Sequence, residues 1–321
     1  MNMKKLLSLM LTLCMVFALA STAMAEPAVK VAALKGPTAM GMVKMMQDDN
    51  GATYDFSIHA AIDEVTPKLV KGEVDIAAVP ANLASVLYNN TQGKIKVIAI
   101  NTLGILYIVE NGNSVQSVED LRGRTIYASG KGATPEYALN YILEGNGIDP
   151  EKDVTLEYKS EHSECLAAFL ANEGSVAMLP QPFVTTAKMK QPDMQVVLDM
   201  NAEWERLQEG SEAPSAMMTG VVVARSEFIE NNPEIMNTFM DAYQASVAFT
   251  NENVDEAAAI IGAYDIVPEA VAKQAVPYCS IVCIEGEEMK TLLSGYLDVL
   301  FSQNPKAVGG AVPADDFYYS R

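Results

Sequence analysis

One strand–turn–helix pattern occurs twice in the chain, about a hundred residues apart, and this repeat constrains the fold more than any other feature. An apolar, β-branched run at 29–34 leads into a turn with Gly36, and a second run at 125–129 leads into a turn with Gly132, 96 residues later. Two further pairs keep the same order, and the residues that end their strands are 100 apart: Pro80 with Pro180, and Asn101 with Asn201. Three ordered pairs at nearly one offset predict two lobes built on the same plan.

The alternation of strands and helices is typical of α/β folds with mostly parallel sheets. A glycine and an extended run follow each third strand, at 104–110 and 220–225, and we predict that these two segments cross between the lobes. From Pro233 the pattern is helical to near the end, with Asn232 as the expected cap, so this block should pack back onto the first lobe. The predicted fold class is therefore α/β, with two similar Rossmann-like lobes, a ligand cleft between them and two crossover segments. Lobe 1 is discontinuous (26–110 plus 219–321) and lobe 2 is 111–218.

Composition narrows the class of protein further. The 321 residues include 22 Lys and Arg against 41 Asp and Glu, a net charge of −19, and half of the residues are hydrophobic. A chain this apolar can bury cores, which excludes wholesale disorder. A chain this acidic has no basic surface for a phosphate backbone, which excludes nucleic acid as a partner.

Residues 1–25 have the pattern of a secretory signal peptide. Lys4 and Lys5 precede an apolar run at 6–20, and Ala23 and Ala25 frame a small-x-small cleavage site. Cys14 lies inside the apolar run instead of after it, so no lipid anchor is predicted. We expect an exported protein in the periplasm or on the extracellular face of the cytoplasmic membrane.

Cysteine and histidine are too sparse to predict a metal site or a cofactor. Beyond the signal peptide the cysteines are Cys165, Cys279 and Cys283, an odd number that does not form a disulfide framework. The last two are four apart and would face each other on one helical turn, so a disulfide or half of a metal site is one interpretation. Buried, inert thiols are the interpretation that we favour, and no cofactor or metal is expected.

Ligands of such sheets bind beyond the carboxyl ends of the strands, where helix N-termini present unpaired N–H groups. The turns at these positions supply most of the candidate site, and a solute that is rich in hydrogen-bond acceptors would suit them. Gln181 offers an amide that donates and accepts, and Phe183 offers a ring that stacks on a flat ligand. Ser163 is expected to cap a helix at 165–171. The candidate ligand-binding residues from the turns are Pro37, Thr38, Ala39, Ser129, Lys131, Gly132, Ala133, Thr134, Glu161, His162, Gln181, Phe183 and Thr219.

Enzyme motifs are missing from the sequence. It has no Gly-x-Ser-x-Gly elbow, no His-Glu-x-x-His helix and no Cys-x-x-Cys pair, and the Gly130-x-Gly132 turn lacks the third glycine of a dinucleotide site. We predict a protein that is not an enzyme and has no catalytic residues.

Five segments carry a resemblance to a known family: Leu-Lys-Gly-Pro-Thr at 34–38, Gly-Glu-Val-Asp-Ile-Ala-Ala-Val-Pro-Ala-Asn at 72–82, Asp-Leu-Arg-Gly-Arg-Thr-Ile at 120–126, the glycine turn at 130–135, and Leu-Pro-Gln-Pro at 179–182. With them the chain resembles type II periplasmic binding proteins, the solute receptors of ABC importers, in the nitrate, sulfonate and taurine branch. The resemblance adds Pro80, Asn82, Asn101 and Thr102 to the candidate ligand-binding residues.

The resemblance implies a monomeric receptor that closes its lobes on a small anion, sulfonate or heterocyclic solute. It would deliver that solute to an ABC permease subunit in the membrane, which works with an ATPase. The alternative is an enzyme on the same fold that acts on a pyrimidine- or pyridoxal-like molecule, with Lys131 or His162 as its reactive group. The synthase-like relatives of that kind carry a cysteine-rich motif, which this sequence lacks.

Overall fold

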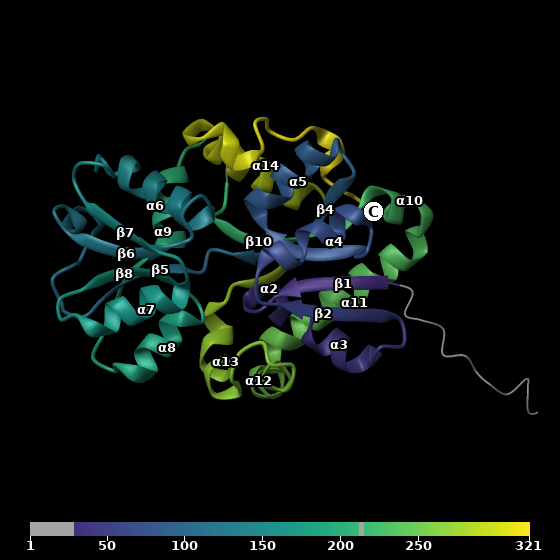
Figure 1. Ribbon diagram of the computed structural model, residues 1–321, viewed down its shortest axis with the longest axis horizontal. Helices are drawn as coiled ribbons and strands as arrows, with labels where there is room; N and C mark the ends of the chain where they lie inside the picture. The colour runs from purple at the N-terminus through teal and green to yellow at the C-terminus, as the bar shows by residue number, and fades with distance from the viewer. Residues whose placement is uncertain (1–28, 212–214) are drawn as a thin grey trace, which may run out of the picture.

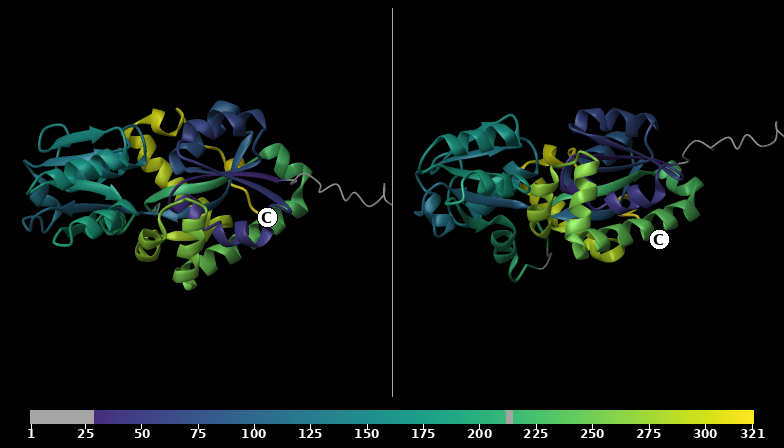
Figure 2. Two further views of the ribbon diagram at one scale, coloured as in Figure 1. Left: turned by 60° about the horizontal axis from the view of Figure 1, so that its bottom comes forward. Right: turned by 90° about the horizontal axis from the view of Figure 1, so that it is seen from below.

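A computed structural model describes residues 29–211 and 215–321, and within them two β-sheets lie one after the other along the long axis of the molecule (Figure 1). Two further views keep the two sheets apart, so the division into two lobes does not depend on the direction of view (Figure 2). The predicted signal peptide, residues 1–25, lies outside the described residues.

The larger sheet has six strands in the order β11-β4-β10-β3-β1-β2. Strand β1 pairs in parallel with β2 and β3, whereas β10 is antiparallel to both β3 and β4, and β11 is antiparallel to β4. The strands are β1 (Val29–Leu34), β2 (Tyr54–His59), β3 (Ile76–Pro80), β4 (Ile95–Leu103), β10 (Met218–Arg225) and β11 (Ile281–Ile284).

The smaller sheet has five strands in the order β7-β6-β8-β5-β9. Strand β6 is parallel to β7 and β8, and β5 is antiparallel to β8 and β9. The strands are β5 (Leu106–Glu110), β6 (Thr125–Ser129), β7 (Thr155–Lys159), β8 (Val176–Pro180) and β9 (Gln195–Asp199).

The two sheets share one strand plan. Reading β2-β1-β3-β10-β4 against β7-β6-β8-β5-β9 matches every strand and every direction, with one antiparallel strand in fourth place. In each sheet that fourth strand follows a crossover from the other lobe. The predicted α/β class with two similar lobes is confirmed.

Of the two predicted crossover segments, only Gly104 and Ile105 connect the lobes, and the rest of both predictions was wrong. Residues 106–110 pair within the smaller sheet as β5, so the first crossover is Gly104 and Ile105 only. Residues 220–225 pair within the larger sheet as part of β10, so the second crossover precedes Met218. An extended run has the same sequence pattern whether it spans lobes or pairs in a sheet. The division into lobes stays a prediction, and the strand pairing favours a boundary before β5 instead of after residue 110.

Helices cover both faces of each sheet (Figure 1). In the larger lobe α5 and α14 cover one face, and α2, α3, α11, α12 and α13 cover the other; in the smaller lobe α6 and α9 lie opposite α7 and α8. The helices are α2 (Pro37–Met40), α3 (Val43–Asp49), α4 (Thr66–Lys71), α5 (Ala81–Thr91), α6 (Thr134–Gly145), α7 (His162–Ala171), α8 (Phe183–Lys190), α9 (Met200–Gln208), α10 (Ser226–Asn231), α11 (Pro233–Glu252), α12 (Val254–Ala263), α13 (Glu269–Ala275) and α14 (Gly286–Gln303). Short 3-10 helices are η1 (Ile62–Glu64), η2 (Val118–Leu121), η3 (Val276–Tyr278), η4 (Pro305–Val308) and η5 (Asp315–Phe317).

Two helix starts differ from the sequence expectation. Pro233 begins α11 as predicted, but the Asn232 side chain does not cap it, since its amide donates back to the Phe228 carbonyl. Helix α7 begins at His162 with Glu161 in the cap position, so Ser163 lies inside the helix and the predicted cap was wrong.

The three cysteines among the described residues are free thiols. Cys279 follows η3 and Cys283 lies in β11, so the two do not share a helical turn as one interpretation assumed. Burial raises the pKa of Cys165, Cys279 and Cys283 to about 12. A thiol with so high a pKa is protonated at neutral pH, which supports the interpretation of inert thiols. Cys165 and Cys279 are buried, whereas Cys283 is partly exposed.

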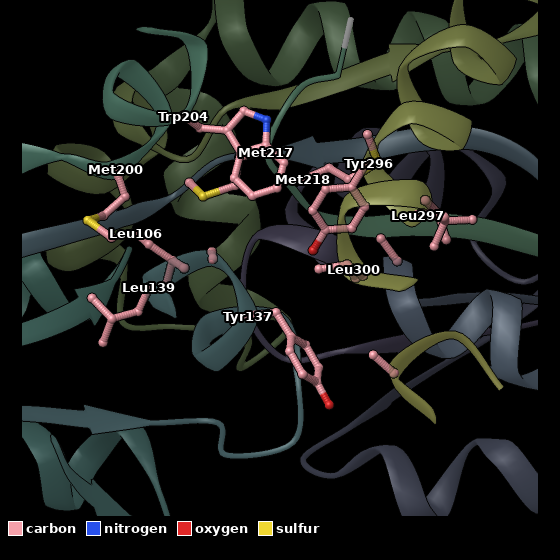
Figure 3. Packing of buried hydrophobic residues seen from close by; sticks show 14 of the residues in the cluster. Leu106, Tyr137, Leu139, Met200, Trp204, Met217, Met218, Tyr296, Leu297 and Leu300 are labelled. Carbon is pink, nitrogen blue, oxygen red and sulfur yellow. The ribbon is translucent and has the colours of Figure 1, made fainter. Parts of the chain in front are cut away.

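One hydrophobic core runs through both lobes on the side of α6, α9 and α14 (Figure 3). The Trp204 ring lies 5.6 Å from the Tyr296 ring, and its indole N–H donates to Ser215 beside the second crossover. Met217 from that crossover and Met218 at the start of β10 are buried in the same cluster. Apolar packing therefore joins the lobes on this side of the molecule.

A buried carboxylate, Glu110, anchors the end of β5. It is 1% exposed, accepts the N–H groups of Ser114 and Val115 at 2.8 and 3.0 Å, and pairs with Arg124 at 2.9 Å. Burial acts to raise its pKa, but hydrogen bonds from Ser114, Val115 and Arg124 outweigh it, so the pKa lies below the ordinary value of 4.5. A carboxylate with a lowered folded-state pKa stabilises the fold above its unfolded pKa and loses that contribution as the pH falls.

Glu110→Gln should therefore lower the free energy of unfolding by about 2 kcal/mol at pH 7, because hydrogen bonds to a buried charged group are lost. The difference from wild type should shrink as the pH falls through the folded pKa, below 4.5. Urea unfolding at pH 7 and pH 3.5 measures it. Glu119, an exposed carboxylate that pairs with Arg122, supplies the control, since Glu119→Gln should cost about 0.5 kcal/mol or less. An equal loss at both pH values for Glu110→Gln would contradict this account.

Candidate functional site

The carboxyl edges of the two sheets meet at the first crossover. Strand β4 ends at Leu103, and β5 begins three residues later at Leu106, directly opposite Pro180 at the end of β8. The backbone N–H of Gln181 donates to the carbonyl of Ile105 at 2.9 Å. We call this junction between the two carboxyl edges the seam. Ligands of such sheets bind beyond these edges, and the two sets of predicted turn residues come from the two sides of the seam.

On the larger lobe, Thr38, Asn101 and Thr102 form one hydrogen-bonded group. The Asn101 amide donates to the Thr38 carbonyl at 3.2 Å, and the Thr102 hydroxyl donates to Asn101 Oδ1 at 3.1 Å. This group closes over Gly220 of β10: a Cβ there would lie 2.5 Å from Asn101 Oδ1 and 2.7 Å from Thr38 Cγ2. Only glycine allows so close an approach. The sequence pattern predicted Gly220 only as the start of a crossover.

On the smaller lobe, Ser129, His162 and Phe183 form a second group. Ser129 Oγ lies 2.5 Å from His162 Nδ1, and the imidazole lies 5.4 Å from the Phe183 ring. Burial lowers the pKa of His162, so the ring is neutral at neutral pH. The tautomer decides the role of the other nitrogen: when the Ser129 hydroxyl donates to Nδ1, a neutral ring carries its proton on Nε2 and is a donor there. Within residues 29–211 and 215–321, Nε2 has no hydrogen-bond partner.

Gln181 presents a fixed amide donor beside this group. The side chain is 5% exposed, and its Oε1 accepts from both the N–H and the hydroxyl of Thr185, at 3.2 and 2.9 Å. These two bonds orient the amide, so Nε2 points away from Thr185, and it has no partner among the described residues. An oriented amide donor that lines a cavity and has no acceptor in the protein is available to a ligand.

Gln181 lines a cavity of about 560 Å³ between the two lobes. The smaller lobe contributes β5, β9, α8 and the turn after β8, and the larger lobe contributes η3 and α13, the latter beside α8 in Figure 1. The cavity is lined by Tyr107, Gln181, Val184, Thr185, Lys188, Val196, Gln274, Pro277 and Tyr278. Its one cationic side chain is Lys188, whose ammonium donates to the Met194 carbonyl at 2.5 Å.

Sequence reasoning missed most of this lining. Tyr107 lies within a strand, and Tyr278 lies in the C-terminal helical block, 171 positions away. No local pattern connects them. The available signal was the prediction that the C-terminal block returns to the first lobe, which brings η3 to the seam.

Several predicted residues have their polar groups engaged inside the protein. Asn82 donates to the Ala307 carbonyl, and the Thr219 hydroxyl donates to the Leu103 carbonyl. The Thr134 hydroxyl accepts from Tyr296 at 2.9 Å, which ties α6 to α14 across the lobes. Pro37 and Ala39 are buried in α2, and Pro80 ends β3.

The glycine turn of the smaller lobe lies partly away from the seam. The Lys131 ammonium stacks over the Tyr158 ring, and the Gly132 N–H donates to the Glu136 carboxylate at 2.6 Å. A carboxylate thus occupies the N–H that was expected to receive a ligand. Ala133 caps α6 through its backbone, and Glu161 is exposed.

A larger groove of about 930 Å³ lies on the outer side of the smaller lobe, between α6 and β7. Its charged lining is Lys131 with four carboxylates: Glu136, Glu144, Asp149 and Glu151. No residue of the other lobe lines it, and its negative charge disfavours an acceptor-rich solute. The seam is therefore the better candidate site.

Residues 29–211 and 215–321 hold no group of three or more His, Cys, Asp or Glu that could bind a metal ion. The same residues form no helix long and apolar enough to cross a membrane.

Comparisons with known proteins agree with this architecture. Residues 39–252 match the family model described as "ABC transporter, phosphonate, periplasmic substrate-binding protein". Putative binding proteins of Brucella abortus are 24% identical over 170 residues, which is 53% of this chain and 50% of theirs. The chain thus aligns with about half the length of the curated relatives it matches.

Two solved structures share the fold over nearly the whole chain. An ABC transporter protein from Parabacteroides distasonis is similar with a TM-score of 0.77 at 24% identity, covering 92% of this chain and 99% of that one. The periplasmic aliphatic sulphonate binding protein SsuA from Escherichia coli has a TM-score of 0.72 at 15% identity, covering 92% of each.

Proposed function

Because the chain belongs to the family of phosphonate periplasmic substrate-binding proteins of ABC transporters, we propose that it is an extracytoplasmic solute receptor whose solute is a small organic oxyanion of the phosphonate or sulfonate type. The phosphonate of the family description and the sulphonate of the E. coli neighbour motivate the solute class. The sequence left both an anionic and a heterocyclic solute open, and the geometry of the seam favours an oxyanion.

The observation that carries the proposal is the pair of unpartnered groups, Gln181 Nε2 and His162 Nε2, at the edge of one lobe. An oxyanion offers hydrogen-bond acceptors only, which matches an amide N–H₂ and the N–H of a neutral imidazole. Hydrogen bonds to an ionised partner are shorter and stronger than neutral ones, so neutral donors suffice to hold a single negative charge.

The two lobes supply the means of closure. The Thr38–Asn101 group lies at the carboxyl edge of the larger sheet, and only two residues, Gly104 and Ile105, form the first crossover. A solute that contacts both edges binds the closed state more tightly than the open one, and this difference in affinity drives closure.

Membership of the family supports the remaining parts of the proposal. The closed receptor delivers its solute to a membrane permease that works with an ATPase, and the receptor itself is an exported monomer. The family consists of substrate-binding components, which supports a receptor that leaves its solute unchanged. Among the described residues the His162 imidazole bonds only to Ser129, so this pair lacks the third group of a catalytic triad.

A thermal-shift screen of residues 26–321, the mature chain without the predicted signal peptide, tests the solute class. The panel contains methylphosphonate, methanesulfonate, phenylphosphonate, benzenesulfonate, nitrate, small carboxylates and thiamine precursors. A phosphonate or sulfonate at about a hundred times its dissociation constant should add about 2.7 kcal/mol to the free energy of unfolding. A shift with the heterocycles alone, or no shift from any phosphonate or sulfonate, would contradict the proposal.

A further inference from the structure

We propose that the cavity between the lobes selects solutes that carry an aromatic ring, and that Tyr107 and Tyr278 hold this ring from opposite sides of the seam. The inference rests on the proposed function, because it takes the oxyanion at Gln181 as the fixed end of the solute. It adds the chemical nature of the other end.

The cavity has the size and the walls for such a group. Its volume of about 560 Å³ lies within the range of small-molecule sites, about 300–1,000 Å³. Apolar side chains line it from both lobes: Val184 and Val196 from the smaller lobe, and Pro277 from the larger. A ring placed there loses contact with water on both faces, which favours binding.

The two tyrosines lack aromatic partners of their own. Neither the Tyr107 ring nor the Tyr278 ring contacts another ring among the described residues. Tyr278 is 58% exposed at the cavity, although large apolar side chains are usually covered. The Tyr107 hydroxyl donates to the Tyr278 carbonyl at 3.5 Å, so the two walls are already joined across the seam.

The polar groups of the cavity fix the orientation of the solute. Gln181 Nε2 is a free donor, whereas the Lys188 ammonium is already bound to the Met194 carbonyl. Burial raises the pKa of Tyr107 to about 12, so that phenol stays neutral. The cavity therefore binds one negative end at Gln181 and offers apolar and aromatic surface to the remainder, which describes an aryl sulfonate or an aryl phosphonate.

Matched probes separate the effect of aromaticity on the affinity from the effect of the size of the ring. Isothermal titration of the mature chain compares benzenesulfonate with cyclohexanesulfonate and with methanesulfonate, and the three corresponding phosphonates repeat the comparison. Stacking on tyrosine should make the benzene member about threefold to tenfold tighter than the cyclohexane member. Burial of the ring should make it at least about tenfold tighter than the methyl member.

Two variants locate the effect. Tyr278→Leu keeps an apolar side chain but removes the ring, and it should bring the benzene-to-cyclohexane ratio to about one. Tyr264→Leu alters another exposed tyrosine of the larger lobe, 37% exposed and outside the cavity, and it should leave the ratio unchanged. Far-UV circular dichroism verifies that both variants are folded.

The outcomes distinguish a failure of the proposed function from a failure of the ring pocket. If no sulfonate and no phosphonate binds, the proposed function fails and the ring pocket fails with it. If the methyl probes bind as tightly as the aryl probes, the proposed function stands and the pocket is wrong. Equal affinity for the benzene and cyclohexane probes, or a preference that survives Tyr278→Leu, overturns the assignment of the ring to these tyrosines.

Discussion

Gln181→Glu should weaken the binding of an organic oxyanion by at least about a hundredfold. The new side chain has nearly the same shape and still accepts both hydrogen bonds from Thr185, so the fold should be preserved. It replaces the free N–H₂ with a second oxygen, which removes a hydrogen bond to a charged group and adds repulsion between like charges. Together these effects exceed the roughly 2.8 kcal/mol that corresponds to a hundredfold change in Kd.

This variant also has a pH signature. Burial raises the pKa of a carboxyl group, so the introduced group should protonate at mildly acidic pH and then donate an O–H to the solute. The affinity of Gln181→Glu should therefore rise as the pH falls from 7.5 to 5.5. Isothermal titration with the tightest-binding member of the sulfonate and phosphonate series measures both effects.

A second glutamine of the same cavity provides the control. Gln274 is exposed on α13, and its amide makes only a 3.5 Å contact with the Ala270 carbonyl. Gln274→Glu adds the same charge without removing an oriented donor, so it should lower the affinity far less than Gln181→Glu does. If Gln181→Glu binds within about threefold of wild type, the amide does not contact the solute.

Gly220→Ala should impair binding from the opposite edge of the seam. The added methyl group would lie 2.5 Å from Asn101 Oδ1 and 2.7 Å from Thr38 Cγ2, so Asn101 and Thr38 must move. Overpacking of this kind costs about 1–3 kcal/mol. Because the displaced groups lie at the carboxyl edge of the larger sheet, we expect about a tenfold loss of affinity together with a lower melting temperature.

Gly145→Ala is the matched control for this substitution. A methyl group there would lie 2.6 Å from Leu207 Cδ1, the end of a flexible side chain that lies away from the seam. This variant should lose stability without losing affinity, as seen by thermal melting and titration side by side. An affinity for Gly220→Ala equal to that of wild type would place the Thr38–Asn101 group outside the binding site.

The architecture was readable from the sequence because hydrophobic pattern and turn residues repeat with the lobes. The offset from Gly36 to Gly132 and from Pro80 to Pro180 corresponds to β1 with β6 and β3 with β8. The crossovers were not readable, because β5 and β10 are extended runs in the sequence and only pairing partners distinguish a strand from a connector. Pairing is a long-range property.

The site was readable only in outline. The rule that ligands bind at carboxyl edges selected Gln181 and the Thr38 turn, but it could not show which groups are engaged elsewhere. The Glu136 carboxylate already accepts the Gly132 N–H, and the Ala307 carbonyl already accepts the Asn82 amide N–H. Such internal hydrogen bonds depend on groups whose positions only the folded structure shows.

Hydrogen exchange of the mature chain, with and without its tightest-binding sulfonate or phosphonate, tests the central claim most directly. Binding in the seam should slow amide exchange in both lobes at once, around residues 38–40 and around residues 181–185. The outer groove at residues 147–158 should exchange at an unchanged rate. Protection confined to one lobe, or protection of the outer groove, would contradict a solute held between the two carboxyl edges.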